Sequence, residues 1–377
     1  MHLDRLLLIG PLPPPHIGPA AATSQLLNSK ILQKSFAVHC LDIGDRSGLS
    51  GIGQLNVHNI FQALYHYKSF IKCMISYKPT IIYISIARGF WGFFRDAILI
   101  IIANFFKIPT IVHLRSGRFD VIHDNGWIGK FIAKRSLAKV ARVLVLSENL
   151  RHIFQDTVDS HKIRIISNGI DAERLNDGAL SIDRSDNAPF TVLCLSNMFH
   201  DKGIHVLIEA AALLVEKNPL LQMIFAGSWL NSEYEEHCNR LIDYFNLQKN
   251  IRLVGVVTGQ EKKELLRSAD VVAFVPIKPE GMPWVVLEAM AAAKPVVGTP
   301  QGAMVEMIRH GETGFLVQPE DPQQLSEAIF QLMQNSQLRT IMGNNARKRI
   351  EENYSTAITH QQLVAVLQEV INGGKNN

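Results

Sequence analysis

The regular alternation of short β-rich runs with longer helical patterns restricts the fold of this 377-residue chain more than any other feature of its sequence. In the first half, most runs rich in Ile, Val and Leu are followed by a stretch with the apolar spacing of a helix, which is typical of a doubly wound parallel sheet. The strands predicted there are 6–10, 37–43, 80–85, 110–114, 143–147 and 163–166, and the helices are 20–34, 60–76, 93–106 and 128–138.

A second alternating set fills the other half of the chain. Its predicted strands are 191–196, 222–226, 251–254, 271–275, 295–299 and 315–317, and its helices are 203–217, 234–245, 262–268, 284–293, 305–309 and 322–335. A last helix is predicted at 357–371. The fold class is therefore expected to be α/β, with two Rossmann-like doubly wound domains facing each other across a cleft.

The composition changes between residues 172 and 189, where Asp, Asn, Ser, Gly and Arg replace large apolar residues. Such a stretch is typical of an interdomain linker, and the chain is longer than one ordinary core accommodates. We therefore predict Rossmann-like domains at 1–172 and 190–353, a linker at 173–189 and a C-terminal helical segment at 354–377.

Composition narrows the class of protein. A hydrophobic content of 47% with 19% charged residues indicates a folded chain rather than a disordered one. The net charge of +4 favours anionic small molecules or an anionic membrane surface as partners, and no nucleic-acid-binding motif is present. The widely spaced cysteines 40, 73, 194 and 238 match no zinc or CxxC pattern and fit a reducing cytoplasm.

Two apolar runs resemble targeting or membrane segments in composition but not in length. The run 97–106 is well short of the roughly 20 residues that a spanning helix needs, so we expect a buried crossover helix there. The run 6–10 is too short for the apolar region of a signal peptide and leads directly into prolines, so it is expected to be the first strand.

The segment 279–295 reads as a loop that leads into a helix. Pro283 suits the first helical position, and good helix formers follow until Lys294 and Pro295 end the pattern. Glu280 lies in the loop and Glu288 follows eight residues later, so both carboxylates are able to face a ligand at the positive end of the helix dipole. The alternative is that acidic residues near a helix start only stabilise the helix.

The sequence of this segment and of the residues that follow it resembles a known signature. Glu-Gly-Met-Pro at 280–283, Leu-Glu-Ala-Met-Ala at 287–291, Lys-Pro-Val-Val-Gly-Thr at 294–299 and Gly-Glu-Thr-Gly-Phe-Leu-Val at 311–317 together resemble the glutamate-x7-glutamate signature of the retaining, GT-B-fold glycosyltransferase family 4, also called glycosyltransferase group 1. The resemblance implies an acceptor-binding N-terminal domain and a nucleotide-sugar-binding C-terminal domain. It also implies that the C-terminal helical segment packs back on the N-terminal domain.

The resemblance also implies roles for the residues of this segment. Glu280 would hydrogen-bond the transferred sugar, and Glu288 would bind the ribose hydroxyls of the nucleotide. The backbone N–H groups of Gly281 and Met282, with Pro283 beside them, would lie next to the diphosphate. Carboxylates suit hydroxyl recognition because each oxygen accepts charge-assisted hydrogen bonds.

Stabilising the leaving diphosphate is the main chemical demand of such a transfer. No Asp-x-Asp pair is present in the sequence, so we expect no metal requirement and no further cofactor. Lys202-Gly203 follows a predicted strand and opens a helix, and the resemblance implies that this pair contacts the distal phosphate of the donor. Five residues earlier the family usually has an arginine, whereas this chain has Asn197, which brings no charge. By itself, a lysine beside a turn glycine would often be a surface feature.

The loop after the first strand offers a second set of candidates. Gly18 permits a close backbone approach to a phosphate or an acceptor, and His16 precedes it as an acceptor candidate. Where the family often has a second glycine, this chain has Pro19, which lacks an N–H group. A proline cluster that forms a rigid turn remains the alternative.

His113 ends a predicted strand, at the edge of the sheet where doubly wound folds bind ligands. In Ile-Val-His-Leu-Arg-Ser-Gly it resembles the strand-end histidine of the family, which contacts the donor sugar, whereas a lone histidine there is otherwise often structural. We therefore predict His113, Glu280 and Lys202 as catalytic residues. Arg115 and Arg118 follow in the same loop as candidates for the acceptor, or as solvated side chains.

We therefore expect a metal-independent retaining glycosyltransferase that moves a sugar from a UDP- or GDP-sugar to a glycan or lipid-linked acceptor, in the synthesis of a surface polysaccharide or glycolipid. The alternative, favoured by Asn197 and Pro19, is a non-catalytic nucleotide-sugar-binding partner subunit. A nicotinamide-dependent dehydrogenase lacks support because no Gly-x-Gly-x-x-Gly follows the first strand. A GT-B-fold epimerase is disfavoured by the complete glutamate pair.

Basic residues recur along 128–142, at Lys130, Lys134, Arg135, Lys139 and Arg142, with apolar residues between them. Such a helix is able to lie against anionic lipid, although a solvated basic face gives the same pattern. The aromatic run 90–94 would suit a lipid-linked acceptor. We therefore expect a cytoplasmic protein that attaches peripherally to the inner face of the cytoplasmic membrane.

Overall fold

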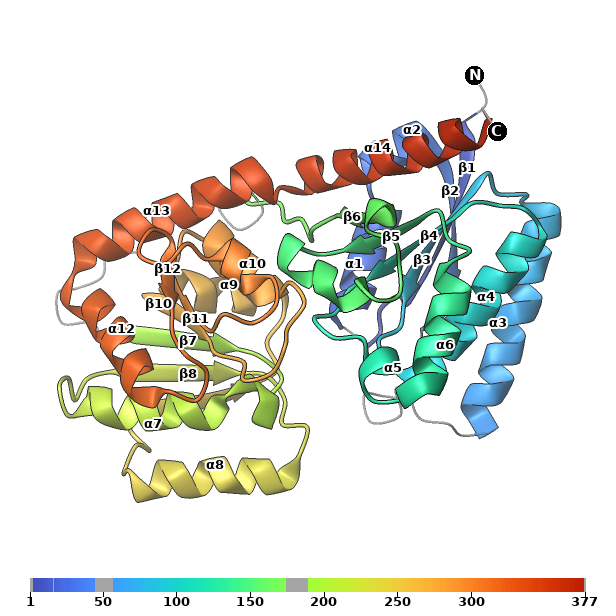
Figure 1. The fold of residues 1–377 in the computed structure, drawn as a ribbon. Helices are drawn as coiled ribbons and strands as arrows, with labels where there is room; N and C mark the ends of the chain where they lie inside the picture. The colour runs from blue at the N-terminus through green and yellow to red at the C-terminus, as the bar shows by residue number, and fades with distance from the viewer. Residues whose placement is uncertain (1–2, 16, 45–56, 174–188, 376–377) are drawn as a thin grey trace. The chain divides into compact units, whose positions relative to one another are not determined.

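The computed structural model describes residues 3–15, 17–44, 57–173 and 189–375 of the chain (Figure 1). His16 and almost all of the predicted linker lie outside these residues. Contacts divide the chain into two compact units, of which the first comprises Met1–Asn168 with Thr356–Asn377 and the second comprises Gly169–Ser355. Each unit is described by itself below.

The first unit contains a parallel sheet with the strand order β2-β1-β3-β4-β5-β6. Its strands are β1 (Asp4–Gly10), β2 (Phe36–Asp42), β3 (Ile81–Ile86), β4 (Thr110–Leu114), β5 (Arg142–Val145) and β6 (Ile163–Ile165). All residues of β3 and β4 are buried, as expected for central strands covered on both faces.

Two layers of helices cover this sheet (Figure 1). On one face lie α1 (Gly18–Leu27), α2 (Lys30–Ser35) and α14 (Thr356–Lys375), which share a core with β1 and β3 through side chains such as Leu26, Leu32, Leu363 and Leu367. The other layer contains α3 (Val57–Ser76), α4 (Phe90–Phe105) and α6 (Gly126–Leu137), with the short α5 (Asp120–His123) beside α6.

The second unit contains a parallel sheet with the strand order β12-β11-β10-β7-β8-β9. The strands are β7 (Thr191–Leu195), β8 (Gln222–Ala226), β9 (Ile251–Gly255), β10 (Val271–Phe274), β11 (Val296–Gly298) and β12 (Gly314–Leu316). The helices are α7 (Ile204–Val215), α8 (Ser232–Tyr244), α9 (Gly259–Ser268), α10 (Trp284–Ala291), α11 (Met304–Met307), α12 (Pro322–Gln334) and α13 (Ser336–Asn353). The predicted fold class of two doubly wound α/β domains is therefore confirmed.

Two of the predicted helices begin or end differently in the structure. The predicted helix 20–34 is broken into α1 and α2, because the Ser29 hydroxyl accepts a hydrogen bond from the Leu32 N–H at 3.3 Å and starts a new helix. Pro283 is the N-cap of α10 rather than its first helical residue, since its ψ of 126° is extended.

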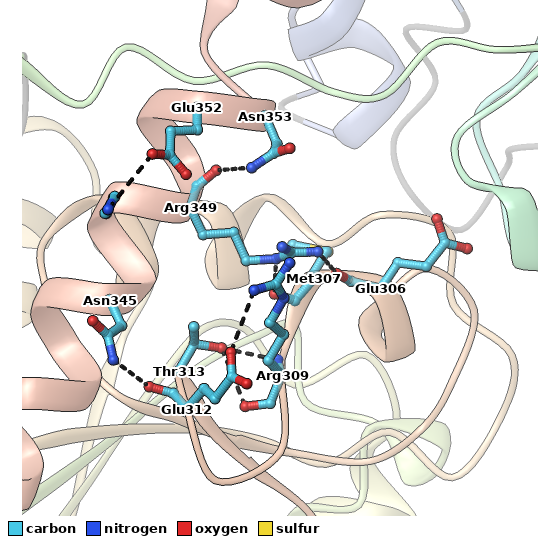
Figure 2. Close-up of polar contacts among 10 residues, drawn as sticks. Glu306, Met307, Arg309, Glu312, Thr313, Asn345, Arg349, Glu352 and Asn353 are labelled. Atoms are coloured by element: carbon cyan, nitrogen blue, oxygen red, sulfur yellow. Dashed lines mark hydrogen bonds and ion pairs between the residues drawn. The ribbon is translucent and has the colours of Figure 1, made fainter.

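The helix α13 was not predicted, because its apolar residues form no clear stripe. Polar contacts hold it in place, as Figure 2 shows. Arg349 donates from Nε to the Met307 carbonyl at 3.1 Å and from its terminal nitrogen to the Glu306 carbonyl, and Asn345 donates to the Glu312 carbonyl at 3.2 Å. The guanidinium of Arg349 thus binds the last carbonyls of α11, which the short helix cannot pair internally.

Candidate functional site

The strand order of the second unit defines a switch point between β7 and β10. From β7 the chain adds β8 and β9 on one side and then returns to add β10, β11 and β12 on the other. The loops that follow β7 and β10 therefore diverge from neighbouring strand ends, which is where open α/β sheets bind ligands. These are the loops 196–203 and 275–283, and both carry predicted site residues.

The backbone of Gly203 brings these two loops into close contact. Lys202 ends a 3-10 turn, and Gly203 follows it with a φ of 68° at the N-cap of α7. A Cβ atom on Gly203 would lie 2.3 Å from the Val275 carbonyl oxygen, so no larger residue fits without displacing the second loop. The Ile277 N–H donates to the Asp201 carbonyl at 2.9 Å, which ties the loops directly.

The two loops bring Lys202 and Glu280 into contact. The Lys202 Nζ forms an ion pair and hydrogen bond with Glu280 Oε1, although the two residues are 78 positions apart in the chain. Their side chains are 17% and 20% exposed, so the pair is largely enclosed and still open to a ligand. The ammonium group also lies 5.3 Å from the centre of the Phe199 ring and 5.4 Å from that of Phe274. The structure thus places a fixed positive charge and a carboxylate at the switch point.

The loop after β11 packs against the backbone of Glu280. Gly302 has a φ of 57°, and a Cβ atom there would lie 1.5 Å from the Glu280 carbonyl oxygen. The Ala303 N–H donates to the Gly281 carbonyl at 3.0 Å. The backbone position of the Glu280 loop is therefore fixed by the loop after β11, and only a glycine at 302 allows the two loops to lie this close.

The helix α10 begins directly after this loop. The first-turn N–H groups at Trp284, Val285 and Val286 have no acceptor one turn earlier, so they present partial positive charge beside Gly281 and Met282. One turn further, Glu288 Oε1 lies 2.5 Å from Lys262 Nζ on α9, and both side chains are half-buried. The sequence did not single out Lys262, because nothing marks one lysine in the Gln-Glu-Lys-Lys-Glu run of α9 as the partner of Glu288.

Asn197 follows β7 on the same loop as Lys202 and is exposed. Its Oδ1 accepts a hydrogen bond from the Ser228 hydroxyl at 3.2 Å. The second unit thus collects Asn197, Lys202, Gly203, Glu280, Gly281, Met282, Pro283 and Glu288 on the loops and helix that follow β7 and β10.

His113 lies at the end of β4 and is fully buried. Its Nδ1 lies 2.8 Å from the Tyr83 hydroxyl, and Arg115 donates from one terminal nitrogen to Tyr83 at 3.0 Å and from the other to Asn168 Oδ1 at 2.7 Å. Burial raises the pKa of Tyr83, so it stays protonated. Because Arg115 only donates, the arrangement that gives the Tyr83 hydrogen an acceptor directs it to His113 Nδ1.

This arrangement makes His113 a neutral imidazole with its hydrogen on Nε2. Burial first, and then the charge of Arg115, hold the pKa of His113 well below its usual value, with the Ile166 carbonyl acting in the opposite direction. The Nε2 atom of His113 is buried. The Tyr83 hydroxyl connects the His113 ring to Arg115 by hydrogen bonds.

The remaining candidates of the first unit differ in their surroundings. Gly18 is the first residue of α1 and is half-buried. Arg118 forms ion pairs with Asp120, at 3.2 Å, and with Asp124, so its charge is already matched on the surface. Its predicted contact with an acceptor stays a prediction.

Comparison with known proteins finds a matching family model, similar sequences and similar folds. Residues 181–349 match the model of the family described as glycosyl transferases group 1. The chain is 29% identical over 231 residues to the capsular polysaccharide biosynthesis glycosyltransferase CapM of Staphylococcus aureus, a match that covers 59% of this chain and 60% of CapM. The chain thus spans less than two thirds of that relative.

A second relative is the GDP-mannose-dependent monoacylated alpha-(1-6)-phosphatidylinositol monomannoside mannosyltransferase of Corynebacterium glutamicum. It is 26% identical over 266 residues, which are 65% of this chain and 68% of that protein.

The fold matches solved structures over nearly the whole chain. The crystal structure of HepE from Anabaena in complex with UDP and glucose superposes with a TM-score of 0.75 at 18% identity, covering 97% of this chain and 99% of HepE. At this identity the likeness concerns the fold, which is the GT-B arrangement of two α/β domains. Residues 181–349 of this chain thus match the glycosyl transferases group 1 family, and the chain has the fold of solved GT-B glycosyltransferases.

Proposed function

We propose that this chain is a metal-independent retaining glycosyltransferase that transfers a sugar from a nucleotide-diphosphate sugar to a glycan or lipid-linked acceptor. The observation that carries the proposal is the Lys202–Glu280 pair at the switch point beside the start of α10. A donor sugar nucleotide carries an anionic diphosphate directly bonded to a polyhydroxylated sugar, so a cation and a carboxylate in contact match the two sides of that junction.

In this proposal the donor exchanges partners with the ion pair. The distal phosphate takes the Lys202 ammonium, and the released Glu280 carboxylate accepts hydrogen bonds from sugar hydroxyls. The first-turn amides of α10 and the backbone of Gly281 and Met282 face the diphosphate, whose negative charge grows as the glycosidic bond breaks. Glu288 would bind the ribose hydroxyls, and Lys262 would orient that carboxylate. Gly203 and Asn197 would complete the donor site.

The first unit would supply the acceptor side. We propose that His16, Arg115 and Arg118 contribute there, while Gly18 approaches the donor diphosphate and His113 acts on the donor sugar through its Nε2 hydrogen. The name of CapM supports a surface polysaccharide as product, and the name of the mannosyltransferase supports a lipid-linked acceptor. UDP in the HepE complex and GDP-mannose in the mannosyltransferase name support UDP- or GDP-sugars as donors. We propose that the transfer takes place in the cytoplasm, at the inner face of the cytoplasmic membrane.

Donor binding and transfer test the proposal together. A panel of UDP-, GDP- and ADP-sugars is screened by thermal shift, where a ligand at 100 times its Kd stabilises the chain by about 2.7 kcal/mol. With the best donor, Lys202→Ala and Glu280→Ala are each expected to lower kcat/KM by about 100-fold or more. Glu327→Ala, on an exposed glutamate of α12, is the matched control and should leave kcat/KM unchanged.

The alternative function is a non-catalytic nucleotide-sugar-binding partner subunit, which the missing charge at Asn197 favours. It predicts donor binding that depends on Lys202 and Glu280 without sugar transfer or donor hydrolysis by the wild-type chain. A chain that binds no sugar nucleotide at all would contradict both functions.

A further inference from the structure

The outer helices of the first unit expose apolar side chains where a soluble surface usually carries polar ones. On α4 the outward stripe at helical spacing consists of Trp91, Phe94, Ile101 and Phe105, all exposed, and Phe105 is 81% exposed. Each lies three to seven residues from the next, so the stripe runs along one side of the helix. Its opposite side, with Phe93, Ala97 and Ile100, packs into the core.

The helices on either side of α4 continue this surface. Figure 1 shows α3, α4 and α6 side by side as one layer, and α4 contacts both neighbours. On α3 the exposed apolar residues include Phe61, Leu64, Tyr65 and Ile75, and on α6 they are Trp127, Ile128 and Phe131. A surface with this many exposed large apolar side chains marks an interaction site.

The charges of the same layer are almost all positive. The segments of α3, α4 and α6 contain six Lys and Arg residues and a single acidic residue, Asp96. Asp96 is fully buried and is neutralised by Arg95 at 2.8 Å, so it contributes no negative charge to the surface. Asp120 on α5 and Asp124, directly after it, are paired with arginines.

At the edge of the apolar surface, the end of α6 and the residues after it expose Phe131, Lys134, Arg135, Ala138 and Lys139. Three cations next to an exposed aromatic ring suit a group that joins a phosphate to acyl chains. None of the helices in the described part of the chain is both long and apolar enough to cross a bilayer.

We propose that α3, α4 and α6 form a docking surface for an anionic lipid bilayer, with the apolar side chains in the acyl boundary and the exposed cations Lys134, Arg135 and Lys139 on lipid headgroup phosphates. This inference deepens the peripheral attachment in the proposed function by naming its surface. Tryptophans flanked by lysines are the side chains that membrane interfaces favour. A second copy of the chain is a poorer occupant, because a two-fold contact would place one basic surface against another.

Vesicle co-sedimentation of the full chain tests the surface, with phosphatidylcholine vesicles that contain or lack phosphatidylglycerol. We expect binding to anionic vesicles that weakens with salt, and little binding to neutral ones. Lys134→Glu with Arg135→Glu should weaken binding to anionic vesicles by about tenfold or more. Trp127→Ser with Phe131→Ser should weaken it as well, while both doubly substituted chains keep wild-type thermal unfolding because the side chains are exposed.

Matched controls come from exposed residues of the second unit. Lys249→Glu with Arg252→Glu repeats the charge change, and Leu220→Ser with Tyr244→Ser repeats the apolar change, since Tyr244 and Trp127 are both 77% exposed. Both controls should bind as wild type does. Equal binding by test and control variants, no binding by wild type, or a dimer that Trp127→Ser with Phe131→Ser dissociates without vesicle binding would overturn the proposal. Vesicle binding requires no donor, so a chain that binds vesicles but transfers no sugar contradicts the proposed function alone.

Discussion

At the scale of single residues, the Tyr83–His113–Arg115 chain is the most informative polar network of the first unit. Three buried or half-buried groups share two hydrogen bonds, and the direction of those bonds follows from Arg115 being a donor at every nitrogen. The network therefore assigns a protonation state to His113 that no sequence pattern shows. It also makes Tyr83 a positioning residue for both its neighbours.

Tyr83→Phe tests this assignment. Removing the hydroxyl takes away the donor to His113 Nδ1, so the nitrogen chemical shifts of this ring should show the Nε2–H form in wild type and a mixture of tautomers in the variant. The same variant should lower kcat of transfer more than it changes KM for the donor, since Arg115 also loses an anchor. Unchanged ring signals would contradict the hydrogen-bond direction, whatever the effect on stability.

Buried histidines predict how stability depends on pH. Burial, with the charge of Arg115, lowers the pKa of His360 to about 4, below its usual value near 6.5. Between these two values the unfolded chain binds more protons than the folded one, so stability falls as the pH falls from about 6.5 towards 4. His66 and His113, whose pKa values are also lowered, act in the same direction.

The variant His360→Gln should lose less stability than wild type between pH 7 and pH 5, by about 1 to 2 kcal/mol. Urea denaturation at both pH values measures the difference. His161→Gln is the control, because an exposed ring is solvated alike in the folded and unfolded chain. A wild-type stability that rises on acidification would contradict the burial of neutral histidines.

At the scale of elements, the order of strands and helices was largely predictable, because burial on both faces leaves apolar runs that turn and cap residues interrupt. The predicted strands 110–114 and 222–226 coincide with β4 and β8, and the others differ by one or two residues at an end. The break at Ser29 and the helix α13 were not predicted, since a cap or a set of arginine-to-carbonyl bonds leaves no apolar periodicity.

The site was predictable to a similar extent. The loops that hold Lys202 and Glu280 followed from the strand ends and from the resemblance, and their direct contact required the structure. Lys262 as the partner of Glu288, and Gly302 as the support of the Glu280 loop, depend on side chains and loops that meet only after folding.

Gly302→Ala tests that support. A Cβ atom would clash with the Glu280 carbonyl oxygen and shift the loop, so donor affinity should fall by about tenfold or more along with stability. Gly311→Ala is the matched control: its φ of 80° is also positive, but nothing lies within 4 Å of the added atom. Its variant should therefore lose only stability, by about 1 to 2 kcal/mol, and keep the donor affinity of wild type. Equal losses of affinity would show that strain alone, rather than the contact with Glu280, matters.

At the scale of the whole molecule, the chain consists of two units with separate sheets and separate cores. The C-terminal helix α14 belongs to the first unit, where Leu363 and Leu367 share the core of β1 and β3. The first unit is therefore built from both the N-terminal and the C-terminal part of the chain, whereas the second unit is continuous in sequence. Most of the residues that we assign to the donor, including the Lys202–Glu280 pair, lie in the second unit.

Hydrogen exchange of the full chain, with and without its best sugar-nucleotide donor, tests this assignment most directly. A donor at the β7–β10 switch point should slow exchange in 196–203 and in 277–288, which includes the first turn of α10. The slowing should be lost in Lys202→Ala at the same donor concentration. Donor binding that leaves these segments unchanged, and slows exchange elsewhere in the second unit instead, would contradict the account.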